Sequence, residues 1–434
     1  MTSHRHSRKL VLRLTLAATA LATLTMNAAA GGLRLYEIAA PEVGLASAGF
    51  GARALDASTV LSNPAGMTRL EGRQVMAGGQ LVYGDVQLAS IPTPNTSSGG
   101  DGGNAVGWLP GGSAFVSYSP APGLKIGFGV ASQFGAAEDY DSGWAGRYYV
   151  KEATLGGISL LPSVAYRVNE RLSVGATLHA MYGILDEEIA VNNALPRFAD
   201  GELKLDDKVW GWGLNLGLLY ELDEATRFSL TYNSQVDLDF KPTLEFTGLA
   251  PGLETLLANR RLLNAQRELG IKVPQSVMAS FYHRIAPEMA ILGSLGWEEW
   301  SKFGKIDVGV EGTELIQNKL QFNDTWHAAI GAQYKPNGPW TYNVGMAYES
   351  SFQDKTNVSP LLPANGAWRY GIGVENEVRK GLSWGVSAAY LYGGSLGTNR
   401  RSILPVALGG RGDLVGSYKD IGLFFLSAHA NWKF

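Results

Sequence analysis

The chain ends on FFLSAHANWKF, residues 424–434, and this stretch decides the fold. Successive side chains of an extended strand point to opposite faces, so every second residue shares a face. One face of this strand is apolar and comprises Phe424, Leu426, Ala428, Ala430, Trp432 and Phe434. The other face is polar and comprises Ser427, His429, Asn431 and Lys433. The pattern predicts a strand that has an apolar phase on one side and water on the other.

The composition favours strands over helices as the membrane-crossing elements. After residue 30, the 434-residue chain contains no apolar run of the roughly 20 residues that a membrane helix requires. It holds 55 Gly, 18 Tyr and 11 Trp. Small residues and interfacial aromatic residues are typical of strands that close into a barrel with aromatic belts at both membrane surfaces. Length alone would also allow two or three soluble domains.

Residues 1–30 are typical of a secretory signal peptide. Arg5, Arg8, Lys9 and Arg13 form a basic front, a short apolar core follows, and three consecutive alanines end at Ala30. We expect cleavage after Ala30, because the apolar core is too short to serve instead as a membrane anchor. The mature chain then has 32 basic and 39 acidic residues, and its net charge of −7 argues against a nucleic-acid partner. The chain has no cysteine, which excludes thiol catalysis and cysteine metal sites.

The remaining chain divides into two parts. Residues 31–73 show no sustained alternation and contain small, polar and helix-compatible residues, so we expect a compact plug, or hatch. Residues 74–434 break into alternating segments that are separated by turn signals. We expect fourteen strands there, at 74–86, 111–119, 124–135, 158–169, 172–191, 204–222, 226–241, 274–286, 289–308, 317–335, 340–352, 367–379, 382–395 and 421–434.

The links between these strands alternate in length. Those after even-numbered strands are short and read PAPG, NE, LDEA, AP, KPNGP and RKG. Those after odd-numbered strands are longer, with one exception near residue 312. Short turns at one end and long loops at the other are typical of an outer-membrane barrel, whose turns face the periplasm. A soluble β-sandwich has no reason to sort its loops by length.

The strand faces predict a lumen with space inside it. In 204–222, large apolar side chains alternate with Gly211, Gly213, Asn215 and Gly217. If the apolar face contacts lipid, the lumen is lined by small and polar residues, and residues 31–73 are available to fill it. The sequence therefore predicts an all-β, transmembrane, antiparallel barrel of fourteen strands with an N-terminal hatch inside the lumen. The strand that ends at Phe434 closes this barrel against the first strand and resembles the terminal assembly signal of bacterial outer-membrane proteins.

Three stretches together resemble the FadL family of outer-membrane transporters for fatty acids and other hydrophobic compounds. The first is GFGARALDASTVLSNPAGMTRLEG at 49–72, which is similar to the family's hatch. The second is LKIGFGVASQFGAAEDYDSGWAGRYYV at 124–150, which is similar to the third strand and the loop that follows it. The third is LPSVAYRVNERLSVGATL at 161–178, a strand-turn-strand hairpin of the family's kind.

The resemblance implies a set of site residues. It places the hatch motif at Asn63, Pro64 and Ala65. It implies an apolar pocket near the mature N-terminus, at Gly31, Leu33, Leu35 and Phe50. It implies lateral release through an inward kink in the third strand, at Gly127, Phe128, Gly129, Ala131, Phe134 and Gly135, with Trp144 and Arg147 in the loop that follows. Glycines inside a strand mark bends or close backbone approach, although glycine is common in other strands of this chain too.

The long loop at 242–273 contains leucines at helical spacing. These are Leu249, Leu253, Leu256, Leu257 and Leu263, and their spacing predicts an amphipathic helix. The helix could present an extracellular docking patch for apolar molecules. It could equally pack against neighbouring loops for stability.

The sequence contains no pattern typical of catalysis, a cofactor or a metal site. The histidines are scattered, and HExxH does not occur. The letters GGSLG at 393–397 fit GxSxG, but they lie at the end of an expected strand with no helix after it, so they form no nucleophile elbow. The Arg-Gly-Asp triplet at 411–413 is short enough to be a chance match. A substrate carboxylate would require a cation or a hydrogen-bond donor, and the candidates are Arg147, Arg284, Lys302, Arg369 and His429.

These observations predict an outer-membrane channel for the passive uptake of hydrophobic small molecules. Long-chain fatty acids are the leading substrate, and monoaromatic or other hydrocarbons are the rival within this class. Outer-membrane lipid and lipopolysaccharide are the expected surroundings. An outer-membrane hydrolase and a structural or adhesive barrel remain as alternatives from other classes.

Overall fold

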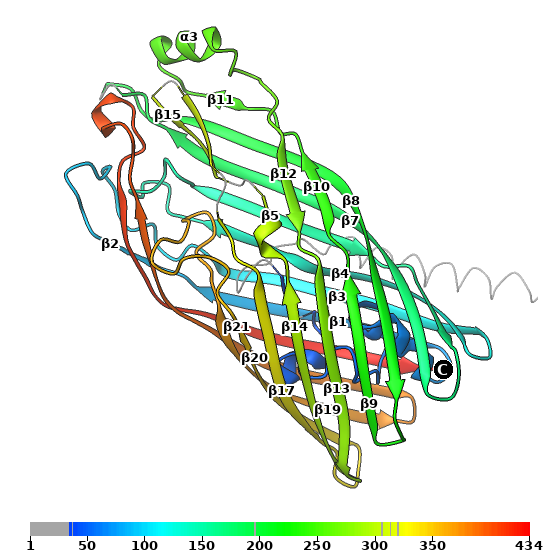
Figure 1. Ribbon diagram of the computed structural model, residues 1–434. Helices are drawn as coiled ribbons and strands as arrows, with labels where there is room; N and C mark the ends of the chain where they lie inside the picture. Colours follow the sequence, from blue (N-terminus) through cyan, green and yellow to red (C-terminus); the bar gives the residue numbers. More distant parts are fainter. Residues whose placement is uncertain (1–33, 37, 195–196, 305–306, 313, 319–320) are drawn as a thin grey trace, which may run out of the picture.

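A closed barrel of antiparallel strands forms most of the computed structural model, which describes residues 34–36, 38–194, 197–304, 307–312, 314–318 and 321–434 (Figure 1). The expected signal peptide and the pocket residues Gly31 and Leu33 lie outside the described residues. The wall strands are β1 (Gln74–Asp85), β3 (Gly107–Ala121), β4 (Leu124–Asp139), β5 (Glu152–Leu160), β6 (Ser163–Arg167), β7 (Leu172–Val191), β8 (Gly201–Glu221), β9 (Thr226–Asn233), β13 (Ser276–Ala286), β14 (Met289–Glu298), β17 (Thr325–Tyr334), β18 (Trp340–Glu349), β19 (Ala367–Arg379), β20 (Leu382–Arg400) and β21 (Leu414–Lys433). Strands β5 and β6 both lie between β4 and β7, so together they occupy one of the fourteen wall positions.

The terminal strand closes the barrel as the sequence predicts. Strand β21 pairs with β1 from Gln74 to Asp85 and with β20 on its other side. Beyond the ladder, the backbones of Arg73 and Phe434 exchange two hydrogen bonds of 3.0 and 2.9 Å. Phe434 is 55% exposed on the outer face, whereas Ser427 is 1% exposed inside. From Leu426 to Phe434, the apolar side chains therefore face lipid and the polar side chains face the lumen.

The short turns, six of two to five residues, lie at one end of the barrel and the long loops at the other (Figure 1). The short link expected near residue 312, which would break this rule, does not join two wall strands. The prediction that strands 289–308 and 317–335 run to a short link near residue 312 is wrong. The wall strands β14 and β17 stop at Glu298 and start at Thr325, and between them lie η3 (Trp300–Lys302) and a separate hairpin of β15 (Asp307–Glu311) and β16 (Glu314–Asn318).

The prediction of a wall strand over 226–241 is also wrong at its end. The wall strand β9 stops at Asn233, and β10 (Val236–Phe240) pairs instead with β12 (Leu269–Val273). The side chains of Val236 and Leu238 are buried against the positions of Gly183 and Gly211 in the neighbouring wall. The apolar alternation of 236–240 thus reflects packing inside the barrel rather than contact with lipid.

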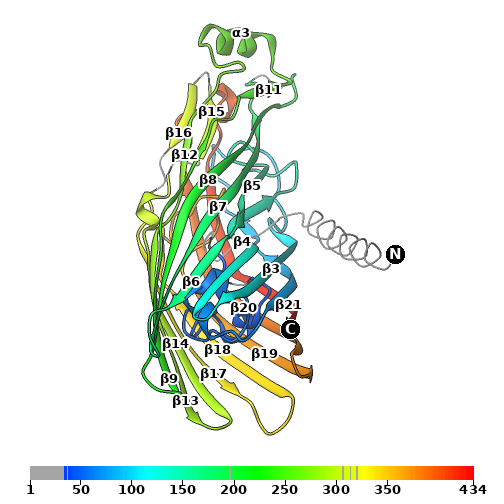
Figure 2. The ribbon, with the colours of Figure 1, turned by 90° about the vertical axis from the view of Figure 1, so that its right-hand side faces the viewer.

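The long loops carry further short elements. They are β2 (Leu88–Ser90), β11 (Glu245–Thr247), α3 (Pro251–Asn259) and η4 (Val406–Leu408). Helix α3 stands at the outermost point of the loop end, as Figure 2 shows. None of the helices in the described part of the chain is both long and apolar enough to cross a membrane.

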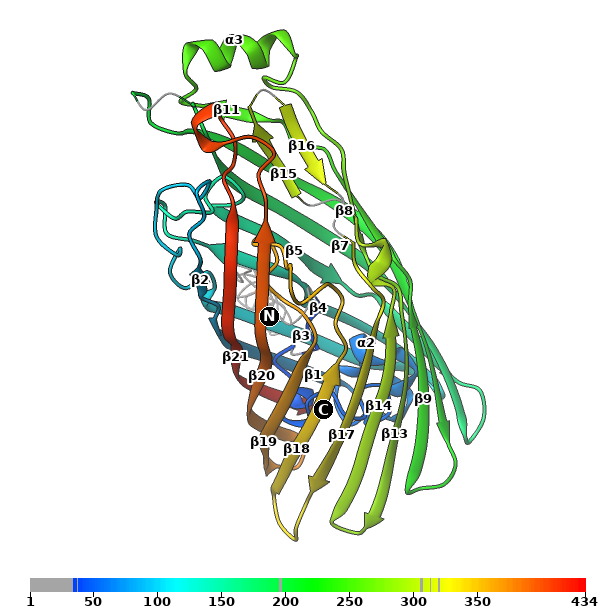
Figure 3. The ribbon, with the colours of Figure 1, turned by 60° about the vertical axis from the view of Figure 1, so that its left-hand side comes forward.

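The segment from residue 34 to 70, here called the hatch, is folded into the barrel. It contains η1 (Pro41–Leu45), α2 (Thr59–Ser62) and η2 (Pro64–Arg69). In Figure 3 these elements lie within the ring of strands, in the half that carries the short turns. Asn63, Ala65 and Met67 are completely buried, which fits a segment enclosed by the wall.

The sorting of the loops gives a testable topology. We expect an epitope inserted between Arg260 and Arg261 to be accessible on intact cells, because this loop lies at the extracellular end. An epitope inserted between Asn337 and Gly338 should react only after the outer membrane is permeabilised. Antibody labelling of whole cells measures both, and surface labelling at Asn337 would contradict the orientation.

Candidate functional site

The hatch motif holds the hatch to the wall through backbone contacts. The side chain of Asn63 accepts a hydrogen bond of 3.1 Å from the N–H of Ala65 and so caps η2. Its amide nitrogen donates to the carbonyls of Gly51, at 2.8 Å, and of Leu218 in β8, at 3.2 Å. One residue therefore joins the start of a helix, a preceding hatch turn and the barrel wall.

Glycines on the inner face of the wall allow the hatch to approach this closely. A Cβ atom at Gly217 would collide with the side chain of Asn63, and one at Gly175 would lie 2.5 Å from the nitrogen of Ala65. On the opposite wall, a Cβ at Gly345 would collide with the carbonyl of Leu45. The inward glycines of several strands thus mark contact with hatch backbone.

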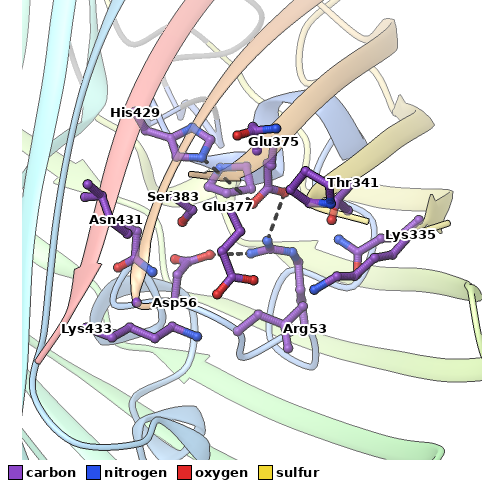
Figure 4. A pocket seen from close by; sticks show the side chains of 17 residues that line it. Arg53, Asp56, Lys335, Thr341, Glu375, Glu377, Ser383, His429, Asn431 and Lys433 are labelled. Carbon is purple, nitrogen blue, oxygen red and sulfur yellow. Dashed lines mark hydrogen bonds and ion pairs between the residues drawn. The ribbon is translucent and has the colours of Figure 1, made fainter. Parts of the chain in front are cut away.

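A polar network ties the hatch to the wall at the periplasmic end (Figure 4). The Arg53 guanidinium lies 2.5 Å from the Asp56 carboxylate and 3.3 Å from Glu375 of β19. These residues line a cavity of about 180 Å³, which His429 also lines, with its Nε2 atom 4.0 Å from Glu375.

The fourth charge of this network, Glu42, is completely enclosed in the hatch. Its carboxylate lies 3.5 Å from Arg53. Burial, together with the nearby Asp56 carboxylate, raises the pKa of Glu42 to about 7 even though Arg53 acts to lower it. Arg53 therefore links two hatch carboxylates to a wall carboxylate, and this network bridges the two parts of the protein.

The barrel wall opens between β3 and β4. Beyond the pair Ser113–Ala131, β3 continues along β1 alone and β4 continues along β5 alone. The ladder between β4 and β5 shifts register between Ala131 and Phe134, which marks a bulge. The end of β4 next meets the loop that precedes β3, where the N–H of Asp139 donates to the carbonyl of Ala105 at 2.7 Å.

The start of the hatch occupies this gap. Arg34 forms an isolated antiparallel bridge with Phe134, and the N–H of Leu35 donates to the carbonyl of Gln133 at 2.9 Å. Backbone groups of the bulge that would face lipid or the lumen unpaired thus obtain partners from the hatch. Leu35 and Phe134 are both buried, and they belong to one apolar cluster.

The residues predicted for a kink divide into two groups. Gly127 and Gly129 lie before the gap, in regular pairing with β3, and a Cβ at Gly127 would lie 2.5 Å from the sulfur of Met67. Ala131, Phe134 and Gly135 lie at the bulge itself. The bulge reverses the alternation of faces, because Phe128 is 42% exposed on the outside whereas Phe134 is fully buried inside.

A continuous apolar cluster runs from the gap to the extracellular loops. It begins at Leu35 and Phe134, passes through Trp300 and Phe303, and reaches Leu257 on α3. The rings of Phe134 and Phe303 lie 6.3 Å apart. The structure therefore provides an apolar interior beside the opening in the wall.

Buried charged and polar side chains of the hatch and the wall lie next to this apolar cluster. They are Arg34, Tyr36, Glu298, Glu349 and Arg369, and they are here called the buried layer. Arg34 lies 3.3 Å from Glu298 of β14, and the hydroxyl of Tyr36 donates to the same carboxylate at 2.8 Å. Glu298 also accepts a hydrogen bond of 2.9 Å from Trp300. Sequence reasoning missed Arg34, Tyr36 and Glu298, because no pattern showed that the hatch and β14 meet.

Of the candidate partners for a substrate carboxylate, only Arg369 belongs to this buried layer. It is 1% exposed, lies 3.0 Å from Glu349, and stands over the ring of Tyr36. Arg284 is at the turn end, where it donates to the carbonyl of Glu224, and Lys302 is exposed at the end of η3. Arg147 lies in the loop between β4 and β5 and pairs with Asp200 at 2.7 Å.

The other predicted site residues pack within the protein. Phe50 contacts Tyr36 edge-on, with ring centroids 5.4 Å apart. Trp144 is fully buried and stacks on Tyr140 at 4.0 Å. On the extracellular loop, Leu257 is fully buried and Leu256 is 49% exposed. The remaining leucines of that loop, Leu249, Leu253 and Leu263, pack against the apolar cluster, which favours the interpretation that the helix packs over the interpretation that it forms a docking patch.

The alternatives from other classes find little support in the geometry. Ser47 and His327 are in contact at 3.2 Å inside the lumen, but among the described residues Nδ1 of His327 has no hydrogen-bond partner. A hydrolytic triad requires a carboxylate there. Arg411 and Asp413 of the Arg-Gly-Asp triplet are both buried, which argues against adhesion through this motif. In the described part of the chain, no cluster of three or more His, Asp or Glu side chains could hold a metal ion.

A closed barrel with short turns at one end, an enclosed hatch and an apolar interior defines a transport barrel of the bacterial outer membrane. The family of outer membrane protein transport proteins (OMPP1/FadL/TodX) matches residues 21–425, and the chain belongs to this family.

The relatives agree with this assignment. The chain is 28% identical to the long-chain fatty acid transport protein of Salmonella typhi, over 91% of this chain and 94% of that protein. It is 28% identical to outer membrane protein P1 of Haemophilus influenzae, over 87% of this chain and 89% of that protein.

Solved structures share the fold. A FadL homologue of Pseudomonas aeruginosa superimposes with a TM-score of 0.79 at 17% identity, over 94% of this chain and 99% of that one. The toluene transporter TodX of P. putida gives a TM-score of 0.63 at 16% identity, over 87% and 94%.

The glycine contacts of the hatch predict the effect of a single substitution. Gly217→Val should displace Asn63 and destabilise the docked hatch by about 1–3 kcal/mol, because overpacking a dense contact costs that much. Hydrogen exchange of peptides from 56–70 should become faster, while the barrel remains resistant to SDS without heating.

The matched control is Gly79→Val in β1. A Cβ atom at Gly79 has its nearest neighbour at 4.0 Å, so hatch exchange should stay at the wild-type rate. Equal exchange in both variants would show that the inward glycines do not position the hatch.

Proposed function

We propose that this protein takes up hydrophobic small molecules across the outer membrane by passive diffusion and releases them sideways through the gap between β3 and β4. The observation that supports this proposal most directly is that hatch residues 34–35, and not a wall strand, bridge the gap. A short segment outside the wall ladder can leave without unpairing β3 from β1 or β4 from β5. The gap can therefore open while the rest of the barrel stays hydrogen-bonded.

The route follows apolar surface from the loops to the membrane. The apolar cluster extends from Leu257 on α3 to Leu35 and Phe134 beside the gap. A hydrocarbon that crossed an aqueous pore would forfeit about 0.8 kcal/mol for each exposed CH₂ group. Sideways exit into lipid avoids this cost, and it requires no catalytic step, so we propose that the protein is a channel and not an enzyme.

Long-chain fatty acids are the proposed substrate, and monoaromatic hydrocarbons are the alternative. The Salmonella typhi relative is named a long-chain fatty acid transport protein, and a structural neighbour is named a toluene transporter. The higher sequence identity of the first favours fatty acids. We further propose that lipopolysaccharide surrounds the charged loop end of the barrel.

A reversible cross-link tests the exit. Arg34 and Phe134 form a non-hydrogen-bonded antiparallel pair, whose Cα separation of about 4.5 Å suits a disulfide. The chain has no cysteine, so Arg34→Cys/Phe134→Cys introduces a single disulfide, which ties the hatch to β4 at the gap. The oxidised variant should lose most of its uptake of radiolabelled fatty acid by whole cells, and reduction should restore uptake.

The matched control links the two strands that flank the gap, at the last pair before it opens. Ser113→Cys/Ala131→Cys joins residues that already lie opposite each other in β3 and β4, so oxidation should leave its uptake unchanged. If the oxidised Arg34/Phe134 variant transports as fast as its reduced form, residues 34–35 need not move, and release past the hatch becomes the better explanation.

A further inference from the structure

A buried carboxyl group without a partner lies inside the barrel beside the gap. Glu138 of β4 is 3% exposed, and its Oε1 atom has no hydrogen-bond partner among the described residues. Other buried acids of the lumen, such as Glu298 and Glu349, are paired with arginines. An isolated buried carboxyl group is costly, so a group that remains unpaired needs a function or a ligand.

The space in front of Glu138 is a small cavity of about 30 Å³ that is lined mainly by apolar residues. That volume holds two or so water-sized groups, which suits the polar end of a molecule but not a hydrocarbon chain. Leu155, Leu185, Leu269 and Ile271 line it and provide apolar contacts for such a chain.

The charges around the cavity select against an anion. In the described part of the chain, its ionisable lining residues are Glu138, Asp186 and Glu187, and none is basic. Lys204 offsets Asp186 from 3.7 Å away, but a bound carboxylate would still meet the buried Glu138 and Glu187 with no basic residue in the lining. A hydroxyl group, in contrast, would donate a hydrogen bond to the free oxygen of Glu138.

Two buried tyrosines near Glu138, Tyr140 and Tyr418, do not donate a hydrogen bond to its carboxyl group. Tyr140 donates to the carbonyl of Pro360 at 2.8 Å, and its oxygen lies 3.0 Å from the hydroxyl of Tyr418. Both phenols therefore satisfy one another and the backbone, and the acceptor on Glu138 remains available for a ligand.

We propose that this cavity binds the hydroxyl end of a neutral apolar molecule, a long-chain alcohol or a phenol, with Glu138 as the residue that determines head-group specificity. The proposal rests on the proposed function, because the ligand must first enter the apolar interior. A molecule whose polar end is an uncharged hydroxyl group should therefore bind beside the gap more tightly than an anion of the same chain length. The channel would then accept hydroxylated hydrocarbons as a substrate class beside fatty acids.

Binding of a matched ligand set to the purified full-length protein tests this assignment. The ligands are dodecanol, methyl dodecyl ether and dodecanoate, each measured by displacement of a fluorescent apolar probe. Wild-type protein should bind dodecanol about tenfold more tightly than the ether, which cannot donate, because a hydrogen bond that satisfies a buried acceptor has roughly that effect. Glu138→Met should bind the alcohol and the ether equally.

A second variant changes the hydrogen-bonding groups without shortening the side chain. Glu138→Gln keeps an acceptor and replaces the acidic group by an amide that can donate, so its affinity for dodecanoate should rise about tenfold while it still prefers the alcohol over the ether. Asp139→Asn is the control, because Asp139 is the exposed neighbour on the same strand, and it should behave as wild type.

The outcomes distinguish the two proposals. If the wild-type protein binds none of the three ligands, the proposed function fails. If it binds all three but shows no preference for dodecanol over the ether, or if both Glu138 variants keep the wild-type order, the assignment of Glu138 is wrong and the uptake channel stands. SDS resistance without heating confirms that each variant is folded.

Discussion

The need to pair every backbone N–H and C=O group in lipid is the constraint on which this structure depends. The ladder from β1 through β21 satisfies it by closing on itself, and the exchange between Arg73 and Phe434 completes the seam. The wall can open only where another segment supplies the missing partners. Residues 34–35 do so at Gln133 and Phe134, and therefore the gap and the hatch form one structural unit.

The same constraint explains the composition of the inner wall. A hatch that pairs with the wall must bring its backbone within contact distance, and a Cβ atom at Gly175, Gly217 or Gly345 would prevent this. Close packing in turn buries the polar groups of the hatch, so Asn63 and Arg53 must find partners on the wall, as they do at Leu218 and Glu375. Glycine rows and buried polar contacts are thus two consequences of one arrangement.

Much of the fold could be predicted from the sequence, because lipid contact imposes alternation that local patterns reveal. The terminal strand, the six short turns and the fourteen wall positions follow from it. The errors arose where alternation has another cause: residues 236–240 alternate because they pack inside the barrel, and 307–318 form a hairpin of their own. The bulge at Ala131–Phe134 contains no glycine, and the only local signal is the glycines beside it, since register depends on the partner strand.

The candidate site was less predictable, because the role of a buried charge depends on a neighbour far away in the sequence. Arg369 was a candidate for a substrate carboxylate, yet Glu349 already pairs with it. Arg34 pairs with Glu298 and Arg53 with Glu375, so these arginines are engaged in holding hatch and wall together. Removing one member of such a pair leaves a buried charge uncompensated, which makes the pairs poor ligand sites and effective clamps. The lumen therefore divides into an ionic half that fixes the hatch and an apolar half that extends from the gap to the loops. Glu138 stands out because it lies in the second half without the partner that the first half provides.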